Sequence, residues 1–84
     1  MSGVTIMKPK FDRIAVKQIE ALDKAIKQRI KVGIYKLPAG DVVKLKGYGN
    51  QFRLRIGGYR VIFTMVDKEI IINEVLPRGS SYKN

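Results

Sequence analysis

The chain has 84 residues, of which 45% are hydrophobic, and this is enough apolar material for one small domain with one core. It contains no cysteine and no histidine, which excludes disulfides, thiolate metal sites and acid–base chemistry by imidazole. Seventeen Lys and Arg residues against seven Asp and Glu residues give a net charge of +10, which predicts an anionic partner or an acidic binding protein.

The sequence also gives expectations about location. The apolar run near the N-terminus is too short for a signal peptide, and the chain lacks the run of about 18 apolar residues that a membrane span requires. We therefore expect residues 1–84 to form a single cytoplasmic domain that does not bind membranes.

The first quarter of the chain predicts a short strand and an amphipathic helix. Val4–Met7 is a short apolar run typical of an edge strand, and Pro9 suits the first turn of a helix better than the interior of a strand. From residue 10 to residue 22 the apolar side chains recur at intervals of three and four, which is helical periodicity.

A second helix is predicted to follow almost without a loop. Asp23 suits the N-cap position, and a second apolar stripe runs from Ile26 to Leu37. Gly33 within this stripe either lets the helix approach a sheet closely or marks a place where the helix frays. Pro38-Ala-Gly40 then ends the helix, since proline lacks an amide donor and glycine is permissive.

Residues 51–66 form the clearest element, a β-hairpin whose arms alternate on either side of Gly57-Gly58. Such a glycine pair favours a two-residue primed turn, because these turns need positive φ. A turn of this length pairs Arg55 with Arg60 and places Arg53 on the same face, because directly paired residues share a face. The opposite, core-facing side is expected to carry Phe52, Leu54, Ile56, Tyr59, Val61, Phe63 and Met65.

The sequence on either side of the hairpin provides two further observations. Residues 42–46 alternate briefly before Gly47, and Lys44 and Lys46 share one side if that segment is extended. A strand over residues 69–76 follows a tight turn, and its three consecutive isoleucines indicate partial coverage of both faces. The expected fold is α+β, with an N-terminal strand, two antiparallel amphipathic helices, and a three-stranded antiparallel meander that completes a small sheet with the helices on one face.

The arginine cluster, joined by Lys44, Lys46 and Arg78, is expected to raise a strongly positive field that suits a polyanion. A guanidinium group matches phosphate oxygens and stays charged at physiological pH. Directly opposed like charges such as Arg55 and Arg60 destabilise a sheet by about 0.2–1 kcal/mol, so their clustering favours a site over a solvated face. No segment is typical of a recognition helix for duplex DNA, whereas Tyr48, Tyr82 and the arginines could stack on the bases of single-stranded RNA.

Three blocks in fixed order then identify a family. They are Lys44-Leu-Lys-Gly47, Phe52-Arg-Leu-Arg-Ile-Gly-Gly-Tyr-Arg-Val-Ile-Phe63 and Val75-Leu-Pro-Arg-Gly-Ser-Ser-Tyr82, preceded by two basic amphipathic helices. Over nearly its whole length the chain resembles the RelE/ParE superfamily of bacterial toxins from type II toxin–antitoxin systems, and within it the RelE-like branch. The resemblance implies a ribosome-dependent endoribonuclease that cuts messenger RNA in the ribosomal A site and inhibits translation, without a metal or another cofactor.

The resemblance also implies roles for individual residues. The catalytic positions are expected to be Arg53, Arg55, Arg60, Arg78 and Tyr82. The RNA-binding positions are expected to be Lys44, Lys46 and Tyr48. The ribose 2′-OH would attack the scissile phosphate while Arg60 and Arg78 stabilise the charge on the phosphorane oxygens. Tyr82 would stack on a base or help to take the 2′-OH proton. Because arginine stays protonated, the general base is expected to be Tyr82, Lys44 or Lys46.

The implied partners are a cognate antitoxin with an acidic, partly disordered segment, the ribosome and messenger RNA, and operator DNA reached through the antitoxin. Two other activities remain open at this point. A ParE-like toxin would inhibit DNA gyrase without nuclease chemistry, and a non-catalytic module would bind nucleic acid as a co-repressor together with the antitoxin.

Overall fold

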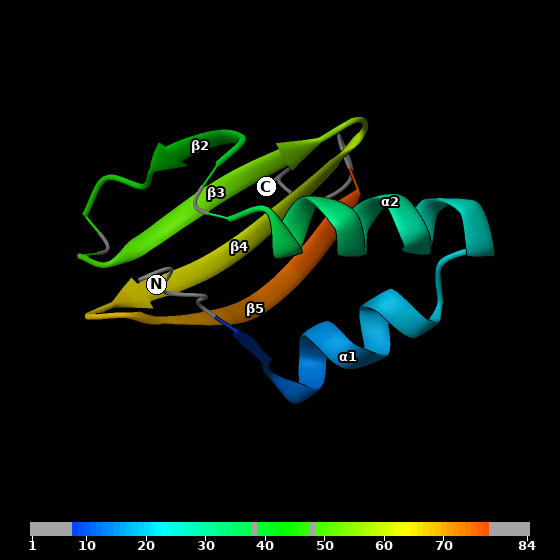
Figure 1. Ribbon diagram of the computed structural model, residues 1–84, viewed down its shortest axis with the longest axis horizontal. Helices are drawn as coiled ribbons and strands as arrows, with labels where there is room; N and C mark the ends of the chain where they lie inside the picture. The colour runs from blue at the N-terminus through cyan, green and yellow to red at the C-terminus, as the bar shows by residue number, and fades with distance from the viewer. Residues whose placement is uncertain (1–7, 38, 48, 78–84) are drawn as a thin grey trace, which may run out of the picture.

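The computed structural model describes residues 8–37, 39–47 and 49–77, and its elements are shown in Figure 1. In chain order they are β1 (Pro9–Phe11), α1 (Arg13–Glu20), α2 (Lys24–Tyr35), β2 (Asp41–Lys44), β3 (Gln51–Ile56), β4 (Tyr59–Val66) and β5 (Glu69–Pro77). The five strands form one sheet in the order β1-β5-β4-β3-β2. The predicted α+β class is confirmed, with both helices packed on one face of this sheet.

The N-terminal strand lies at a different place from the one predicted. β1 runs parallel to β5, with Pro9 opposite Ile70 and Phe11 opposite Ile72. The prediction that Pro9 begins a helix was wrong: as the first residue of an edge strand, it loses no ladder hydrogen bond. Phe11, which matched the helical periodicity, lies in β1, and α1 begins two residues later. The predicted strand at residues 4–7 lies outside the described residues.

The antiparallel meander has four strands, β2 to β5, and not the predicted three. The additional strand is β2, in which Val42 pairs with Leu54 and Lys44 pairs with Phe52. At four residues, β2 is too short for its alternation to predict a strand without its partner. Its pairing with β3 creates the strand and also fixes which of its side chains face each side of the sheet.

The core lies between the sheet and the two helices. Its buried apolar side chains are Ala15, Ile19, Ile30, Ile34, Leu37, Leu54, Val61, Phe63, Ile70, Ile72 and Val75. Gly33 lets α2 approach the sheet, because a Cβ atom at this position would lie 2.5 Å from Cδ1 of Ile56. Close approach is thus the correct one of the two explanations for this glycine, and the helix continues to Tyr35. Asp23 occupies the predicted N-cap position, although its side chain makes no capping hydrogen bond.

The predicted hairpin register is confirmed. Ile56 pairs with Tyr59 and Arg55 pairs with Arg60, so the turn contains two residues. Gly57 has φ +56° and supplies the only positive φ of this turn, which is the pattern of a type II′ turn.

The last strand pairs along the second arm of the hairpin, from Val66 opposite Glu69 to Tyr59 opposite Pro77. The pairing contains one irregularity, between Ile62 and Phe63.

The outer edge of β5 is covered by two elements in succession. β1 pairs with β5 only as far as Ile72, whose carbonyl oxygen accepts a hydrogen bond from the Asp12 amide at 2.9 Å. Further along, the Val75 amide donates to Oε1 of Gln18 at 2.6 Å. A side chain of α1 therefore replaces a neighbouring strand at this position. In the described part of the chain, no helix is long and apolar enough to cross a membrane.

Candidate functional site

Three arginines gather on the face of the sheet away from the helices. Arg55 is paired with Arg60 across β3 and β4, and Arg53 is paired with Ile62. These residues alternate with Leu54 and Val61, which are buried beneath the helices. We call Arg53, Arg55 and Arg60 the arginine face, and its predicted convergence is confirmed.

Two carboxyl groups lie beside the arginines on this face. Asp41 in β2 is paired with Arg55, and Glu74 in β5 is paired with Ile62. Neighbouring strands lie about 4.8 Å apart, so each carboxyl group is close enough to reduce the positive potential of the arginines. The segment from residue 42 to residue 66 contains no acid. Pairing with β2 and β5 nevertheless brings one carboxyl group to each side of the arginines.

Arg53 lies in more apolar surroundings than Arg55. Its strand neighbours are Val43 and Ile62, and its side chain is half-buried, whereas Arg55 is exposed. Within the described residues, Nε of Arg53 is buried and has no hydrogen-bond acceptor. A buried donor that lacks an acceptor costs about 1–3 kcal/mol. A hydrogen bond from this guanidinium group to a bound anion would offset that cost.

Lys44 does not join the arginine face. Lys44 is paired with Phe52, so it lies on the helix side of the sheet, and Lys46 lies in the turn after β2. The expected convergence of Lys44 with the arginines was wrong, because the register of β2 directs Asp41 and Val43 to that face instead. Their roles in RNA binding stay predictions.

Three predicted site residues, Tyr48, Arg78 and Tyr82, lie outside the described residues. The strand that leads to two of them is described as far as Pro77, which is paired with Tyr59 and thus neighbours Arg60 along β4. The expected pairing of this strand with the second arm of the hairpin is confirmed.

One cation near the hairpin turn was not predicted. Nη1 of Arg29, an exposed residue of α2, lies 3.5 Å from the position that a Cβ atom on Gly57 would occupy. Arg29 therefore reaches the end of the hairpin where Arg55 and Arg60 lie. The basic character of α2 is visible in the sequence, but this contact depends on the packing of α2 against β3, which the sequence does not reveal.

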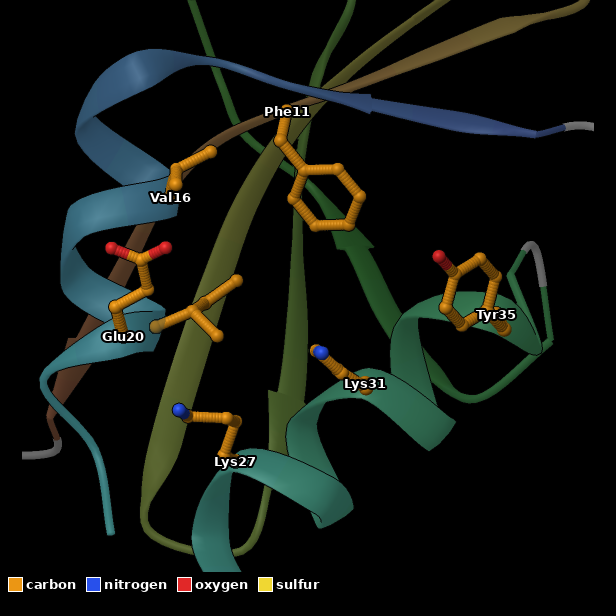
Figure 2. Close-up of a pocket in the computed structure, with 7 residues that line it drawn as sticks. Phe11, Val16, Glu20, Lys27, Lys31 and Tyr35 are labelled. Atoms are coloured by element: carbon orange, nitrogen blue, oxygen red, sulfur yellow. The ribbon is translucent and has the colours of Figure 1, made fainter. Parts of the chain in front are cut away.

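A pocket lies in the helical layer, with a volume of about 340 Å³. Figure 2 shows Phe11 entering it from β1, Val16 and Glu20 from α1, and a row of residues from α2. Its lining consists of Phe11, Val16, Ile19, Glu20, Lys27, Lys31 and Tyr35. The lining combines an apolar floor with charged side chains, and no motif in the sequence pointed to it. In the part of the chain that the structure covers, no group of His, Cys, Asp or Glu could hold a metal ion.

Comparisons with known proteins identify the family. No known family model matches the sequence. Toxin RelE3 of Methanocaldococcus jannaschii is 33% identical in an alignment that covers 90% of this chain and 96% of that protein.

Two solved structures are similar as well. A chain of the RelB-RelE antitoxin-toxin complex from Methanococcus jannaschii matches with a TM-score of 0.73 and 31% identity, covering 84% of this chain and 92% of that one. A chain of the archaeal RelE-RelB complex from Pyrococcus horikoshii OT3 matches with a TM-score of 0.71 and 33% identity, covering 92% of this chain and 100% of that one. This chain therefore belongs to the RelE family of toxins.

Proposed function

We propose that this protein is a ribosome-dependent endoribonuclease that cleaves messenger RNA and is silenced by an antitoxin. The observation that carries the proposal is the strand register that places Arg53, Arg55 and Arg60 on one open face of the sheet. Guanidinium groups fixed on neighbouring strands are preorganised donors for phosphate oxygens. The RelB-RelE complexes of the two similar structures support an antitoxin partner.

In the proposed reaction the ribose 2′-oxygen attacks the adjacent phosphorus and the bond to the 5′-oxygen breaks. The products are a 2′,3′-cyclic phosphate and a 5′-hydroxyl end. The 2′-OH proton passes to a general base, and a general acid supplies a proton to the leaving 5′-oxygen. The arginines hold the negative charge that grows on the non-bridging oxygens, because they remain protonated throughout.

Arg78 and Tyr82 complete the proposed site. Pro77 is paired with Tyr59, and consecutive Cα atoms are about 3.8 Å apart, so the chain leaves β5 within reach of Arg60. Because Lys44 lies on the other side of the sheet, we assign the role of general base to Tyr82 or Lys46. Arg29 extends the phosphate-binding surface past the hairpin turn.

The test is induction of the protein in a bacterial host, with a primer-extension map of ribosome-bound transcripts. We expect cuts in phase with codons, and a loss of about 10²–10³-fold in cleavage rate for Arg60→Ala and Arg78→Ala, the magnitude typical of removing one transition-state donor. The control is Lys68→Ala, in the exposed turn at the other end of β4. Intact transcripts with a DNA-damage response would favour gyrase inhibition, and intact transcripts without one would favour a co-repressor.

A further inference from the structure

We propose that Asp41 and Glu74 are specificity-determining residues that weaken the binding of free RNA to the arginine face. The proposal rests on the proposed nuclease function and deepens it, because it assigns part of the requirement for the ribosome to side chains of this protein. The two carboxylates repel the phosphates of an RNA strand that arrives from solution. A message that the ribosome holds at the arginine face is present at a high local concentration, so it binds in spite of the same repulsion.

The two carboxyl groups stand on opposite sides of the arginines. Figure 1 shows β2 and β5 as the strands that flank the hairpin of β3 and β4. Asp41 is the cross-strand partner of Arg55. Glu74 pairs with Ile62, which pairs in turn with Arg53. Since neighbouring strands lie about 4.8 Å apart, a phosphate bound on the arginine face has a carboxyl group within a short distance on either side.

Neither carboxyl group forms an ion pair with the arginines beside it. Between described residues the structure contains one ion pair, which joins Lys10 to Glu69 at the other end of β5. Asp41 is exposed and Glu74 is half-buried. A carboxylate that is not paired with a guanidinium group keeps most of its field for an approaching anion. Both groups can therefore act on RNA before it touches the sheet.

The placement of these two acids favours a role in specificity over a role in solubility. The other acids of the chain lie in α1, at the helix starts or around the turn between β4 and β5; they are Asp12, Glu20, Asp23, Asp67 and Glu69. Nonspecific binding to nucleic acid is almost entirely electrostatic, so a carboxylate beside the phosphate site opposes it directly. Proteins also gain specificity by placing repulsive charges against an unwanted partner. Free RNA is the unwanted partner of a toxin that acts on the ribosome.

Coulomb's law gives the size of the effect. A unit charge about 8 Å from a phosphate in water changes the binding constant about twofold to threefold. Neutralising both carboxylates should therefore raise the affinity for RNA about fivefold to tenfold. The Debye length is about 10 Å at 0.1 M salt and about 3 Å at 1 M, so the gain should be present at low salt and vanish at high salt. A change in stability alone would not follow this dependence on salt.

The experiment measures how the full-length protein binds a short single-stranded RNA, using fluorescence anisotropy. The 2′-hydroxyls of this RNA are methylated, which prevents cleavage. The test variant is Asp41→Asn/Glu74→Gln. The matched control is Glu20→Gln/Asp67→Asn, which changes the net charge by the same amount at exposed positions away from the arginine face.

We expect Kd at low salt to fall about fivefold to tenfold in the test variant and by less than about twofold in the control. Equal Kd values for the two variants would overturn the proposal, because the position of the charges would then be irrelevant. A difference that persists at about 1 M salt would overturn it as well, since the carboxylates are screened under that condition.

A second measurement connects binding to the choice of substrate. It compares the cleavage rate of an unmodified RNA free in solution with that of the same RNA in the ribosomal A site. The ratio of the free rate to the bound rate should rise about fivefold in the test variant, whereas a purely structural role would lower both rates together. An unchanged ratio would overturn the role of the carboxylates in substrate choice. If the wild-type protein cleaves no RNA on the ribosome, the proposed function fails, and the Kd comparison still decides whether the carboxylates weaken RNA binding.

Discussion

Replacing Gly33 with alanine is expected to change protein stability in a direction that depends on Ile56. Helix propensity alone favours alanine by about 1 kcal/mol. The structure opposes this gain, because the new Cβ atom would lie 2.5 Å from Cδ1 and 3.0 Å from Cγ1 of Ile56. Overpacking a core costs about 1–3 kcal/mol, so Gly33→Ala should lower the free energy of unfolding by up to about 2 kcal/mol.

The decisive variant removes the obstacle. In an Ile56→Ala background the side-chain atoms that meet the new Cβ are gone, so the same Gly33→Ala change should stabilise the protein by about 1 kcal/mol. Urea unfolding of the four proteins in this cycle gives the coupling energy, which should be about 1–3 kcal/mol, the size found for residues in contact. Gln28→Ala, at an exposed position of α2, is the control. If Gly33→Ala stabilises both backgrounds equally, the close approach of α2 to β3 is not what requires glycine.

Three other changes test separate features of the structure. Gln18→Ala removes the acceptor of the Val75 amide and should lower the free energy of unfolding by about 1–3 kcal/mol; no change in urea unfolding would show that water replaces the bond. Gly57→Ala places a Cβ at φ +56° and should cost about 1–2 kcal/mol, more than Gly58→Ala in the same assay. Arg29→Ala should lower the salt slope of binding to a single-stranded RNA by about 0.7, and an unchanged slope would remove Arg29 from the interface.

Local patterns predicted the parts of the fold that local physics determines. The alternation on both sides of Gly57-Gly58 was sufficient for the register of the hairpin, because a two-residue turn leaves one way to pair the arms. The position of Arg53 on the same face as Arg55 and Arg60 follows from that register. The second helix was also predicted from a local pattern, because its apolar stripe repeats over three turns.

The errors came from pairings between distant segments. The sequence around Pro9 suits both a helix start and an edge strand, and the choice depends on parallel pairing with β5, some 60 residues later. The prediction placed Lys44 with the arginines, whereas it lies on the helix side of the sheet. The register of β2 depends on the path of the loop that follows it, which the sequence does not reveal. The same register brought Asp41 to the arginine face, and helix packing brought Arg29 to the hairpin turn.

The contact between Gln18 and Val75 also bears on how copies of this protein meet one another. A strand edge with free amides can accept a strand from another molecule and so seed aggregation. β1 protects β5 only as far as Ile72, and from there the Gln18 side chain occupies the Val75 amide. The body of α1 at this edge also leaves less room for a foreign strand. α1 therefore shields this end of the β5 edge from pairing with a strand of another copy.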